Sequence, residues 1–184
     1  MGKVVGGALL SLDGFMSDRN GDLSRLYPDL EAFGQEEVLI ESIRTTGAVV
    51  MGRRAYDMAQ GDFTGYEYQA PIFVLTHRPP EKPAKGENDK LSFSFVTDGI
   101  ASAIAKAKAA AGDKYVTVVG GAQTAQACLQ AGLMDEIQVH IMPLLLGEGL
   151  RLFENLGPQP IELERIKVIV SPTGRTDILF RVVK

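Results

Sequence analysis

Short runs of apolar residues alternate along this chain with stretches in which apolar residues recur at the spacing of a helix. This alternation constrains the fold more than any other feature. The run at 48–51, AVVM, ends at Gly52 and leads into a short helix from about Arg54. The run at 115–119, YVTVV, leads through two glycines into a helix over 121–132. Runs that are apolar at nearly every position are typical of parallel strands covered on both faces. The alternation therefore predicts an α/β fold with a parallel sheet between helices.

The remaining segments extend this pattern and then change it. Strands are expected at 4–11, 71–76, 92–96 and 135–143, and loops at 11–23 and 144–153. Helices are expected at 30–45 and 97–112. The second of these helices has Asp98 as its expected N-cap and Gly112 just past its end. The segments 161–171 and 176–184 have period-2 patterns and are joined by PTGR, a hairpin signal. We therefore predict three layers: a twisted, mostly parallel sheet, helices on both faces, and antiparallel C-terminal strands.

Length, composition and charge exclude several classes of protein. A chain of 184 residues is expected to form a single domain, 1–184. Its one cysteine, Cys128, excludes an internal disulfide, and no stretch approaches the roughly 20 apolar residues of a membrane span. The N-terminus lacks a secretory signal, and the net charge of −4 argues against nucleic-acid binding. We expect a cytoplasmic protein with small-molecule partners. His77, His140 and Cys128 lack the spacing of a metal site, so none is predicted.

Two strand ends have the same local chemistry. Gly52 follows one buried run, and Gly120 and Gly121 follow the other, each directly before a helix start. In a parallel α/β sheet, ligands bind at the carboxyl ends of the strands. A helix start there offers unpaired N–H groups to an anion, and glycine lets the backbone approach it closely. The alternative is that these glycines only make tight turns.

Cationic and hydroxyl side chains follow the same strand ends. Arg53 and Arg54 carry guanidinium groups that match phosphate geometry, and the strand at 71–76 ends in Thr76, His77 and Arg78. Three such ends together predict a nucleotide with several phosphates, although solvated arginines remain the simpler alternative. No GxGxxG, GxxxxGK[ST] or GxSxG motif occurs, which excludes the usual dinucleotide fingerprint, a Walker-type ATPase and a serine-nucleophile elbow.

Five segments in this order resemble a known superfamily: SLDGFMS, VVMGRRAYD, IFVLTHR, VVGGAQTAQACL and DEIQVHIMPLLLGEGLRLF. The chain resembles the dihydrofolate reductase-like superfamily over roughly residues 3–183. The last segment resembles the reductase domain of riboflavin biosynthesis and its stand-alone relatives. The resemblance implies a twisted, mostly parallel sheet, NADPH as hydride donor and a homodimer.

The resemblance also implies roles for individual residues. Arg53 resembles the arginine that meets the adenosine 2′-phosphate, and Thr76 the hydroxyl residue beside it, with His77 or Arg78 nearby. The turn and helix start under the pyrophosphate correspond to Gly120, Gly121, Ala122, Gln123 and Thr124. We expect the Gly120–Gly121 link to be strained, with a cis peptide as one form of that strain.

Three residues are candidates for catalysis. Asp29 resembles the acid of dihydrofolate reductases, and Asp13 resembles the start of the loop that covers nicotinamide in this superfamily. The resemblance also places His140 on a strand that borders the substrate cleft. Each of two residues also has a purely structural explanation. Asp29 can be an acid that the helix dipole favours in a first turn, and His140 can be a histidine of the core or of the sheet surface. The sequence does not rank these residues against water as the proton donor.

The sequence therefore predicts an NADPH-dependent reductase acting on a small pyrimidine- or pterin-like substrate. The segment LLLGEGLRLF favours 5-amino-6-(5-phosphoribosylamino)uracil reductase over dihydrofolate reductase. Ala55 and Phe15 depart from the patterns of those enzymes, where threonine and lysine are usual, and they keep open a nucleotide-binding module without turnover. A structural dimer with incidental glycines and arginines is the third alternative. The apolar alternation of 161–171 and 176–184 predicts a homodimer formed by these strands and the loop at 144–149.

Overall fold

The computed structural model describes residues 2–28, 34–172 and 174–184. Its strands are β1 (Val4–Ser11), β2 (Phe15–Ser17), β3 (Thr46–Gly52), β4 (Ile72–Leu75), β5 (Phe93–Val96), β6 (Tyr115–Val119), β7 (Glu136–Met142), β8 (Leu150–Arg151), β9 (Leu163–Val170) and β10 (Thr176–Val182). Its helices among these residues are α2 (Glu37–Thr45), α3 (Arg53–Met58), α4 (Ile100–Ala111) and α5 (Ala122–Gln130).

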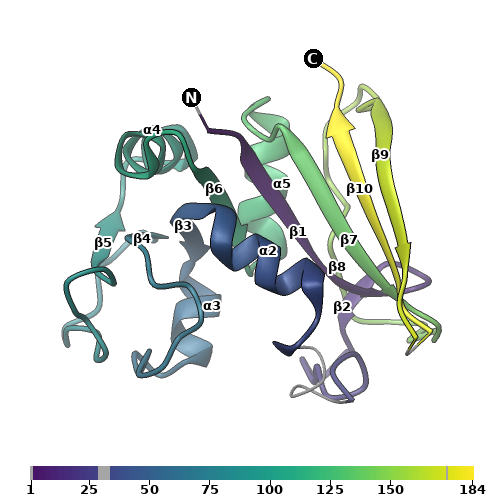
Figure 1. Cartoon of the computed structure of the whole chain (residues 1–184), viewed down its shortest axis with the longest axis horizontal. Helices are drawn as coiled ribbons and strands as arrows, with labels where there is room; N and C mark the ends of the chain where they lie inside the picture. Colours follow the sequence, from purple (N-terminus) through teal and green to yellow (C-terminus); the bar gives the residue numbers. More distant parts are fainter. Residues whose placement is uncertain (1, 29–33, 173) are drawn as a thin grey trace.

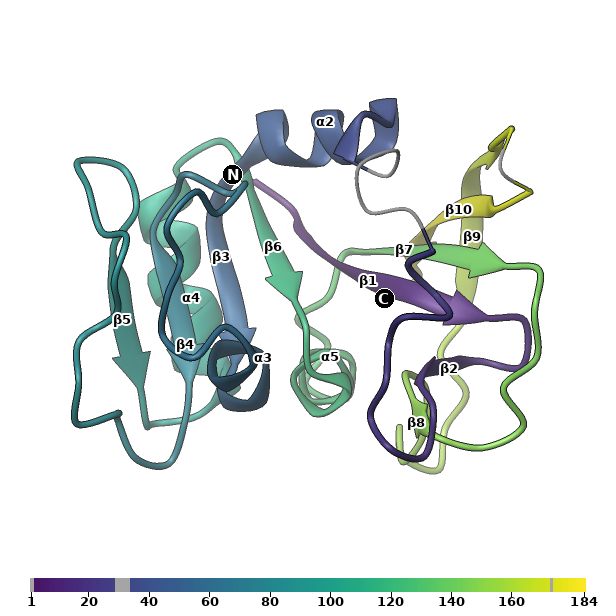
Figure 2. The same ribbon diagram turned by 90° about the horizontal axis from the view of Figure 1, so that it is seen from below.

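One sheet of eight strands organises the molecule, in the order β5-β4-β3-β6-β1-β7-β10-β9 (Figure 1). The strands from β5 to β7 pair in parallel, whereas β10 pairs antiparallel with both β7 and β9. Figure 2 shows α2 over one face of the sheet and α5 on the other, and α4 packs beside α5. The predicted α/β fold, mostly parallel with antiparallel C-terminal strands, is confirmed.

Strand β3 explains why both faces of the sheet are covered. Ala48 and Val50 belong to a core shared with α4 and α5, whereas Val49 and Met51 belong to a second core on the opposite face. Successive side chains of a strand point to opposite faces, so an apolar residue at every position requires cover on both sides. The second core is rich in aromatic rings, and Tyr56 stacks edge-on against Phe95 there with ring centroids 5.4 Å apart.

The structure corrects three local predictions. Asp98 is not the N-cap of α4: Gly99 holds that position with φ 97°, and the Asp98 carboxylate instead accepts a hydrogen bond from the Ser102 hydroxyl at 2.8 Å. The segments expected as loops contain β2 and β8, which pair antiparallel in a small second sheet. The helix expected at 30–45 is not continuous: Glu36 is extended with ψ 136°, α2 begins at Glu37, and residues 29–33 lie outside the described residues.

Candidate functional site

The carboxyl ends of β3 and β6 lie side by side, because these two strands pair in parallel with Met51 beside Val119. After β3 the chain continues to β4, toward one edge of the sheet, and after β6 it continues to β7, toward the opposite edge. Such a reversal of strand order opens a crevice at the carboxyl ends, where ligands bind in open α/β sheets. The two glycine-ended strands of the sequence therefore meet at the switch point of the sheet.

A cavity of about 1120 Å³ opens at this position, and we call it the strand-end cavity. Its walls come from the ends of several strands and from loops that are distant in sequence. The eleven residues that the sequence predicts for a cofactor all line it: Gly52, Arg53, Arg54, Thr76, His77, Arg78, Gly120, Gly121, Ala122, Gln123 and Thr124.

Glycines are required where the two strand ends approach each other. A Cβ atom on Gly52 would lie 2.5 Å from the Thr124 hydroxyl oxygen, and one on Gly120 would lie 2.7 Å from the Ala55 Cβ. Gly120 and Gly121 have φ 67° and 80°, which glycine adopts without the strain other residues would incur. The described residues contain no cis peptide, so the Gly120–Gly121 link is a left-handed trans turn and the expected cis form is wrong.

Three groups of the protein hold Arg53 near the carboxyl end of β4. Its Nε donates to the Asp57 carboxylate at 2.7 Å, and its Nη1 donates to the Arg78 carbonyl oxygen at 2.6 Å and more weakly to the Thr76 hydroxyl at 3.5 Å. Thr76 is itself buried and donates its hydroxyl to the same Arg78 carbonyl at 2.9 Å. The guanidinium is thus oriented toward the ends of β3 and β4 by the protein itself, while Arg54, His77 and Arg78 remain exposed.

Helix α5 begins at the wall of the strand-end cavity. Its N-cap is Gly121, which supplies no side chain to cap the helix, and the Gly121 carbonyl accepts from the N–H groups of Thr124 and Ala125. The N–H groups of the two residues before Thr124 are the kind that has no partner within a helix and attracts anions. The start of α5 therefore has the chemistry of a phosphate site beside Arg53 and Arg54.

Sequence reasoning missed the rest of the cavity wall. Thr97 and Gly99 follow β5, and the strand-end argument applied to that strand would have found them. Most of the other members come from β1 and from the segments at 16–27 and 58–67, where no local signal marks them. They are largely apolar or aromatic and include Leu9, Met16, Leu23, Tyr27, Met58, Phe63 and Tyr66. The wall is completed by Met51, Ala55, Leu75, Val119 and Leu150.

Asp13 does not line the strand-end cavity and instead fixes a neighbouring loop. Its carboxylate accepts hydrogen bonds from the N–H groups of Gly147 at 2.8 Å and Leu146 at 3.1 Å. The pKa of Asp13 is lowered to about 2, first by a hydrogen bond from Ser11 and then by these N–H groups. Asp13 thus joins the turn after β1 to the segment LLLGEG as an ionised carboxylate.

His140 also lies outside the cavity lining, within a group of charged side chains that we call the Arg175 cluster: Glu36, His140, Arg175 and Asp177. Arg175 and Asp177 are buried, and Glu36 and His140 are half-buried. The Asp177 carboxylate accepts from His140 Nδ1 at 2.7 Å and from Arg175 at 2.7 and 2.9 Å, and Arg175 also pairs with Glu36. Burial opposes ionisation of Asp177, but its hydrogen bonds with His140 and Arg175 leave its pKa lowered.

This cluster places His140 next to the cavity without exposing it there. His140 pairs in register with Leu9 of β1, and Leu9 lines the cavity.

The candidate acid Asp29 lies outside the described residues. Among the described residues, no three His, Cys, Asp or Glu side chains gather as metal ligands would, and no helix is long and apolar enough to cross a membrane.

Solved structures define the class of protein to which this fold belongs. Dihydrofolate reductase from Enterococcus faecalis, complexed with NADP(H) and RAB-propyl, superposes with a TM-score of 0.63 at 13% identity, covering 99% of this chain and 97% of that one. A protein from Shewanella sp. PV-4 assigned to riboflavin biosynthesis superposes with a TM-score of 0.81 at 27% identity, covering 99% of both chains. The fold is dihydrofolate reductase-like.

The family follows from the sequence. The model of the RibD C-terminal domain matches residues 3–180, and the chain belongs to that family. The bifunctional deaminase and 5-amino-6-(5-phosphoribosylamino)uracil reductase of Thermotoga maritima superposes with a TM-score of 0.72 at 16% identity, where this chain spans 57% of that protein. The uncharacterised protein YyaP of Bacillus subtilis strain 168 is 23% identical over 185 residues, covering 97% of this chain and 94% of YyaP.

Proposed function

We propose that this protein is an NADPH-dependent reductase that transfers a hydride to a small pyrimidine-like substrate, most like 5-amino-6-(5-phosphoribosylamino)uracil. The observation that carries the proposal is the convergence of cations, glycines and a free helix start on one cavity at the switch point of the sheet. Membership of the RibD C-terminal domain family supports the reductase class and the substrate class. The proposal treats residues 1–184 as a single domain.

The residues at the cavity fit a nicotinamide dinucleotide with a 2′-phosphate. Close approach of the backbone at Gly52, Gly120 and Gly121 leaves room for a pyrophosphate beside the start of α5. Arg53, held beside Thr76 and the Arg78 carbonyl, would meet the terminal phosphate at the edge of the cavity. The apolar and aromatic part of the wall would hold flat rings, as ligand sites commonly do.

The division of labour in the proposed reaction is simple. Bound NADPH supplies the hydride, and the protein supplies binding, orientation and electrostatics. The strand ends hold the phosphates, and the walls from β1 and from 58–67 hold the substrate ring against the cofactor. The loop after β1 is held by Asp13 and covers one side of the cavity through Met16 and Ser17. The proton reaches the substrate from Asp29, His140 or water, and the proposal does not choose among them.

Isothermal titration of two variants with two cofactors tests this assignment. Replacing Arg53 with alanine should weaken NADPH binding by about one to two orders of magnitude, because a hydrogen bond to a charged group contributes roughly 1.5–3 kcal/mol. NADH lacks the 2′-phosphate and should hardly change. Arg54→Ala should weaken both cofactors, since Arg54 lies beside the proposed pyrophosphate site.

Two outcomes would contradict the proposal. If Arg53→Ala weakens NADH as much as NADPH, Arg53 does not contact a 2′-phosphate. If the parent protein binds neither cofactor, the cavity is not a nicotinamide site. If the parent protein binds NADPH, turnover is measured as oxidation of NADPH in the presence of 5-amino-6-(5-phosphoribosylamino)uracil or of dihydrofolate. The substrate that supports oxidation separates a pyrimidine reductase from a folate reductase. Binding of NADPH without turnover of either substrate would favour the nucleotide-binding module.

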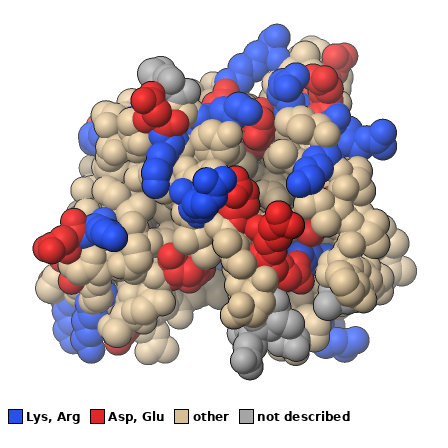
Figure 3. Space-filling model, viewed as in Figure 1, with Lys and Arg blue, Asp and Glu red and all other residues tan. Residues whose placement is uncertain are grey.

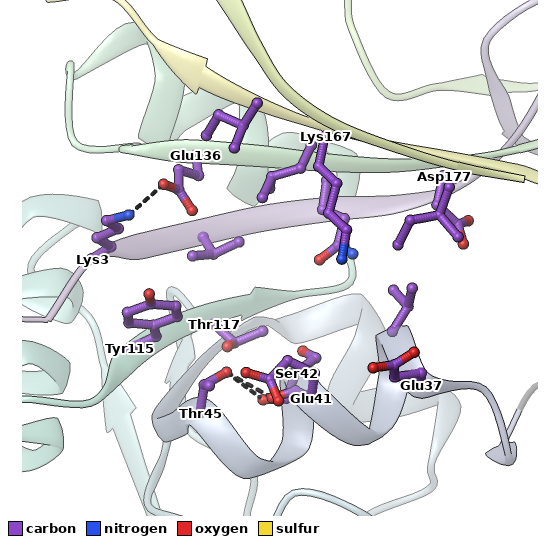
Figure 4. Close-up of a pocket in the computed structure, with 16 residues that line it drawn as sticks. Lys3, Glu37, Glu41, Ser42, Thr45, Tyr115, Thr117, Glu136, Lys167 and Asp177 are labelled. Carbon is purple, nitrogen blue, oxygen red and sulfur yellow. Dashed lines mark hydrogen bonds and ion pairs between the residues drawn. The ribbon is translucent and has the colours of Figure 1, made fainter.

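The same proposal includes a cytoplasmic homodimer. Strand β9 is the edge of the sheet, with Val168 and Val170 46% and 73% exposed, and α2 has no buried side chain. Figure 3 shows acidic atoms near the centre of this face, in the area of α2, with basic atoms around them. A groove of about 400 Å³ lies between α2 and the sheet (Figure 4), with Glu37 and Glu41 on one wall and Lys167 on the other.

In the proposed dimer, this surface forms a two-fold interface. A two-fold axis brings the acidic helix of one copy to the basic strand of the other, and the apolar side chains of β9 become covered. We therefore place the proposed interface at β9, one of the C-terminal strands expected from the sequence, and at α2, while the part expected for the loop 144–149 stays a prediction. Sedimentation of the parent protein at micromolar concentration should give a dimer, and a monomer would count against this part of the proposal.

A further inference from the structure

Tyr66 carries a polar atom whose presence the fold does not explain. Its hydroxyl oxygen is buried and has no hydrogen-bond partner, and it is the one such side-chain atom among the residues that the structure describes. Native proteins pair nearly all buried polar groups, because an unpaired hydroxyl loses its hydrogen bonds to water without replacement. Each exception therefore calls for a reason specific to the protein.

The neighbouring Tyr68 shows the ordinary solution in the same surroundings. Its ring centroid lies 5.8 Å from that of Tyr66, and its hydroxyl forms a 3.0 Å hydrogen bond with the Ser42 hydroxyl of α2. Burial raises the pKa of both tyrosines, so both hydroxyls are protonated at neutral pH. Two adjacent tyrosines thus share one environment, and one of them lacks a partner within the protein.

Position indicates where the missing partner lies. Tyr66 lines the strand-end cavity, in the part of its wall that contains Tyr27, Met58 and Phe63 rather than the cofactor residues. The Phe63 ring stands edge-on to Tyr66, with centroids 5.3 Å apart, and supports it from the protein side. Tyr66 lies in a turn between Gly65, with φ 75°, and Tyr68, outside any helix or strand. The residue with the unpaired hydroxyl therefore belongs to the wall of the cavity.

We propose that Tyr66 is a substrate-binding residue, whose hydroxyl turns into the cavity and hydrogen-bonds a polar ring atom of the pyrimidine-like substrate. The inference rests on the proposed function, because it assumes that this side of the cavity receives the substrate. The unpaired hydroxyl makes the free protein less stable than it would be with phenylalanine, and the substrate supplies the hydrogen bond that the protein omits. Sites that hydrogen-bond their ligand discriminate strongly against analogues that lack the polar group.

Replacing each tyrosine by phenylalanine separates this role from a structural one. Tyr66→Phe should raise the melting temperature of the free protein by about 2–4 °C, because it removes an unpaired polar group from the interior. The same variant should weaken binding of 5-amino-6-(5-phosphoribosylamino)uracil about tenfold, the loss expected for one hydrogen bond. NADPH affinity should remain within about twofold, since Tyr66 lies apart from the cofactor residues. In the matched control, Tyr68→Phe should lower the melting temperature and leave uracil binding unchanged.

The possible results are distinct. Lower stability in Tyr66→Phe would mean that the hydroxyl has a partner, such as a buried water, and would overturn the inference. Unchanged uracil binding, or an equal loss of NADPH affinity, would overturn it as well. Binding is measured by calorimetry without turnover, so a parent protein that binds the uracil but does not reduce it would overturn the proposed reductase function and leave the role of Tyr66 standing. A parent protein that does not bind the uracil would overturn both.

Discussion

Arginines have different surroundings in two parts of the sheet: the parallel half, which contains the strands from β5 to β7, and the antiparallel half, which contains β10, β9 and the hairpin between them. In the parallel half, Arg53, Arg54 and Arg78 lie at strand ends and face a cavity, where they are half-buried or exposed. In the antiparallel half, Arg175 is 3% exposed and binds Asp177 and Glu36 inside the fold. An arginine at the carboxyl end of a parallel strand meets a crevice, whereas an arginine in a hairpin that folds back onto the sheet meets other side chains.

This difference indicates which charges are available to a ligand. In the parallel half, Arg54 and Arg78 are exposed at the cavity, and Arg53 is held beside it by Asp57, Thr76 and the Arg78 carbonyl. The Arg175 cluster satisfies its charges internally, so it contributes to structure whatever the protein binds. Buried ion pairs often add little net stability, but breaking one by removing a single partner is strongly destabilising. The two halves should therefore respond differently to substitution.

The largest effect is expected inside the Arg175 cluster. Arg175→Ala leaves Asp177, itself 3% exposed, without its bidentate partner and should cost about 3–5 kcal/mol of unfolding free energy. The control is Arg181→Ala, on the strand β10 that directly follows Arg175. Its 2.7 Å pair with Glu164 is more than half exposed and should be worth less than about 1 kcal/mol. Urea unfolding measures both. Equal losses would remove the distinction between the two kinds of ion pair.

The next effect concerns the close approach at the strand-end cavity. Gly120 and Gly132 have similar φ values of 67° and 65°, but a Cβ on Gly120 would lie 2.7 Å from Ala55, whereas one on Gly132 would meet nothing within 4 Å. Alanine at either position incurs the left-handed strain, and at Gly120 it adds a clash that should cost about 1–3 kcal/mol more. Only Gly120→Ala should also weaken NADPH binding. Unfolding free energies and calorimetry check both statements, and matching losses at the two sites would contradict them.

A smaller effect is expected at the proposed dimer surface. Lys167→Glu places a negative charge on β9, which the proposed two-fold axis brings to the acidic helix α2 of the other copy, and it should raise the dimer dissociation constant about tenfold, or about 1.4 kcal/mol. Combining it with Glu37→Lys should restore the dimer, because the charges are then exchanged across the two-fold axis. Sedimentation of the single and double variants decides this. Lys90→Glu, in an exposed loop outside the groove, controls for net charge, and a failure of the double variant to recover would exclude this interface.

The smallest effect is the acid response of Asp13. Its pKa in the folded protein is about 2, below the ordinary value of 3.8, so its hydrogen bonds stabilise the native state fully above about pH 4. That stabilisation is lost as the pH falls from 3.8 toward 2, because the carboxyl group must then be protonated. Asp13→Asn should lower the melting temperature at neutral pH and flatten its fall in this window. Melting curves of both proteins that stay parallel from pH 5 to pH 2 would show that Asp13 does not contribute.

The sequence predicted the parallel half of the molecule well, for a local reason. A buried parallel strand, the glycine that ends it and the ligand-facing residues after it are consecutive, so one short window such as GAVVMGRRAYD contains the whole pattern. Strand β1 was expected at 4–11 and lies there, and all residues named at the ends of β3, β4 and β6 line one cavity. The Asp98 cap was predicted wrongly because a glycine one residue later adopts the cap conformation.

Contacts between distant residues decided the remaining features, in both halves of the molecule. His140 is separated by 37 positions from Asp177, and Arg175 by 139 from Glu36, so no window shows that these charges neutralise one another. The hydroxyls of Tyr66 and Tyr68 look equivalent in the sequence YEY, yet only the position of Ser42 on α2 gives one of them a partner.

The amino-acid sequence by itself thus determined the alternation of strands and helices, the class of fold and the chemistry at the strand ends. These properties depend on side-chain periodicity and on the backbone freedom of glycine, which act over a few residues. Only the tertiary structure decided which polar groups are buried, which are paired and which face the cavity. Burial and pairing depend on which elements pack together, and a charge or hydroxyl has its effect only through the neighbours that packing supplies.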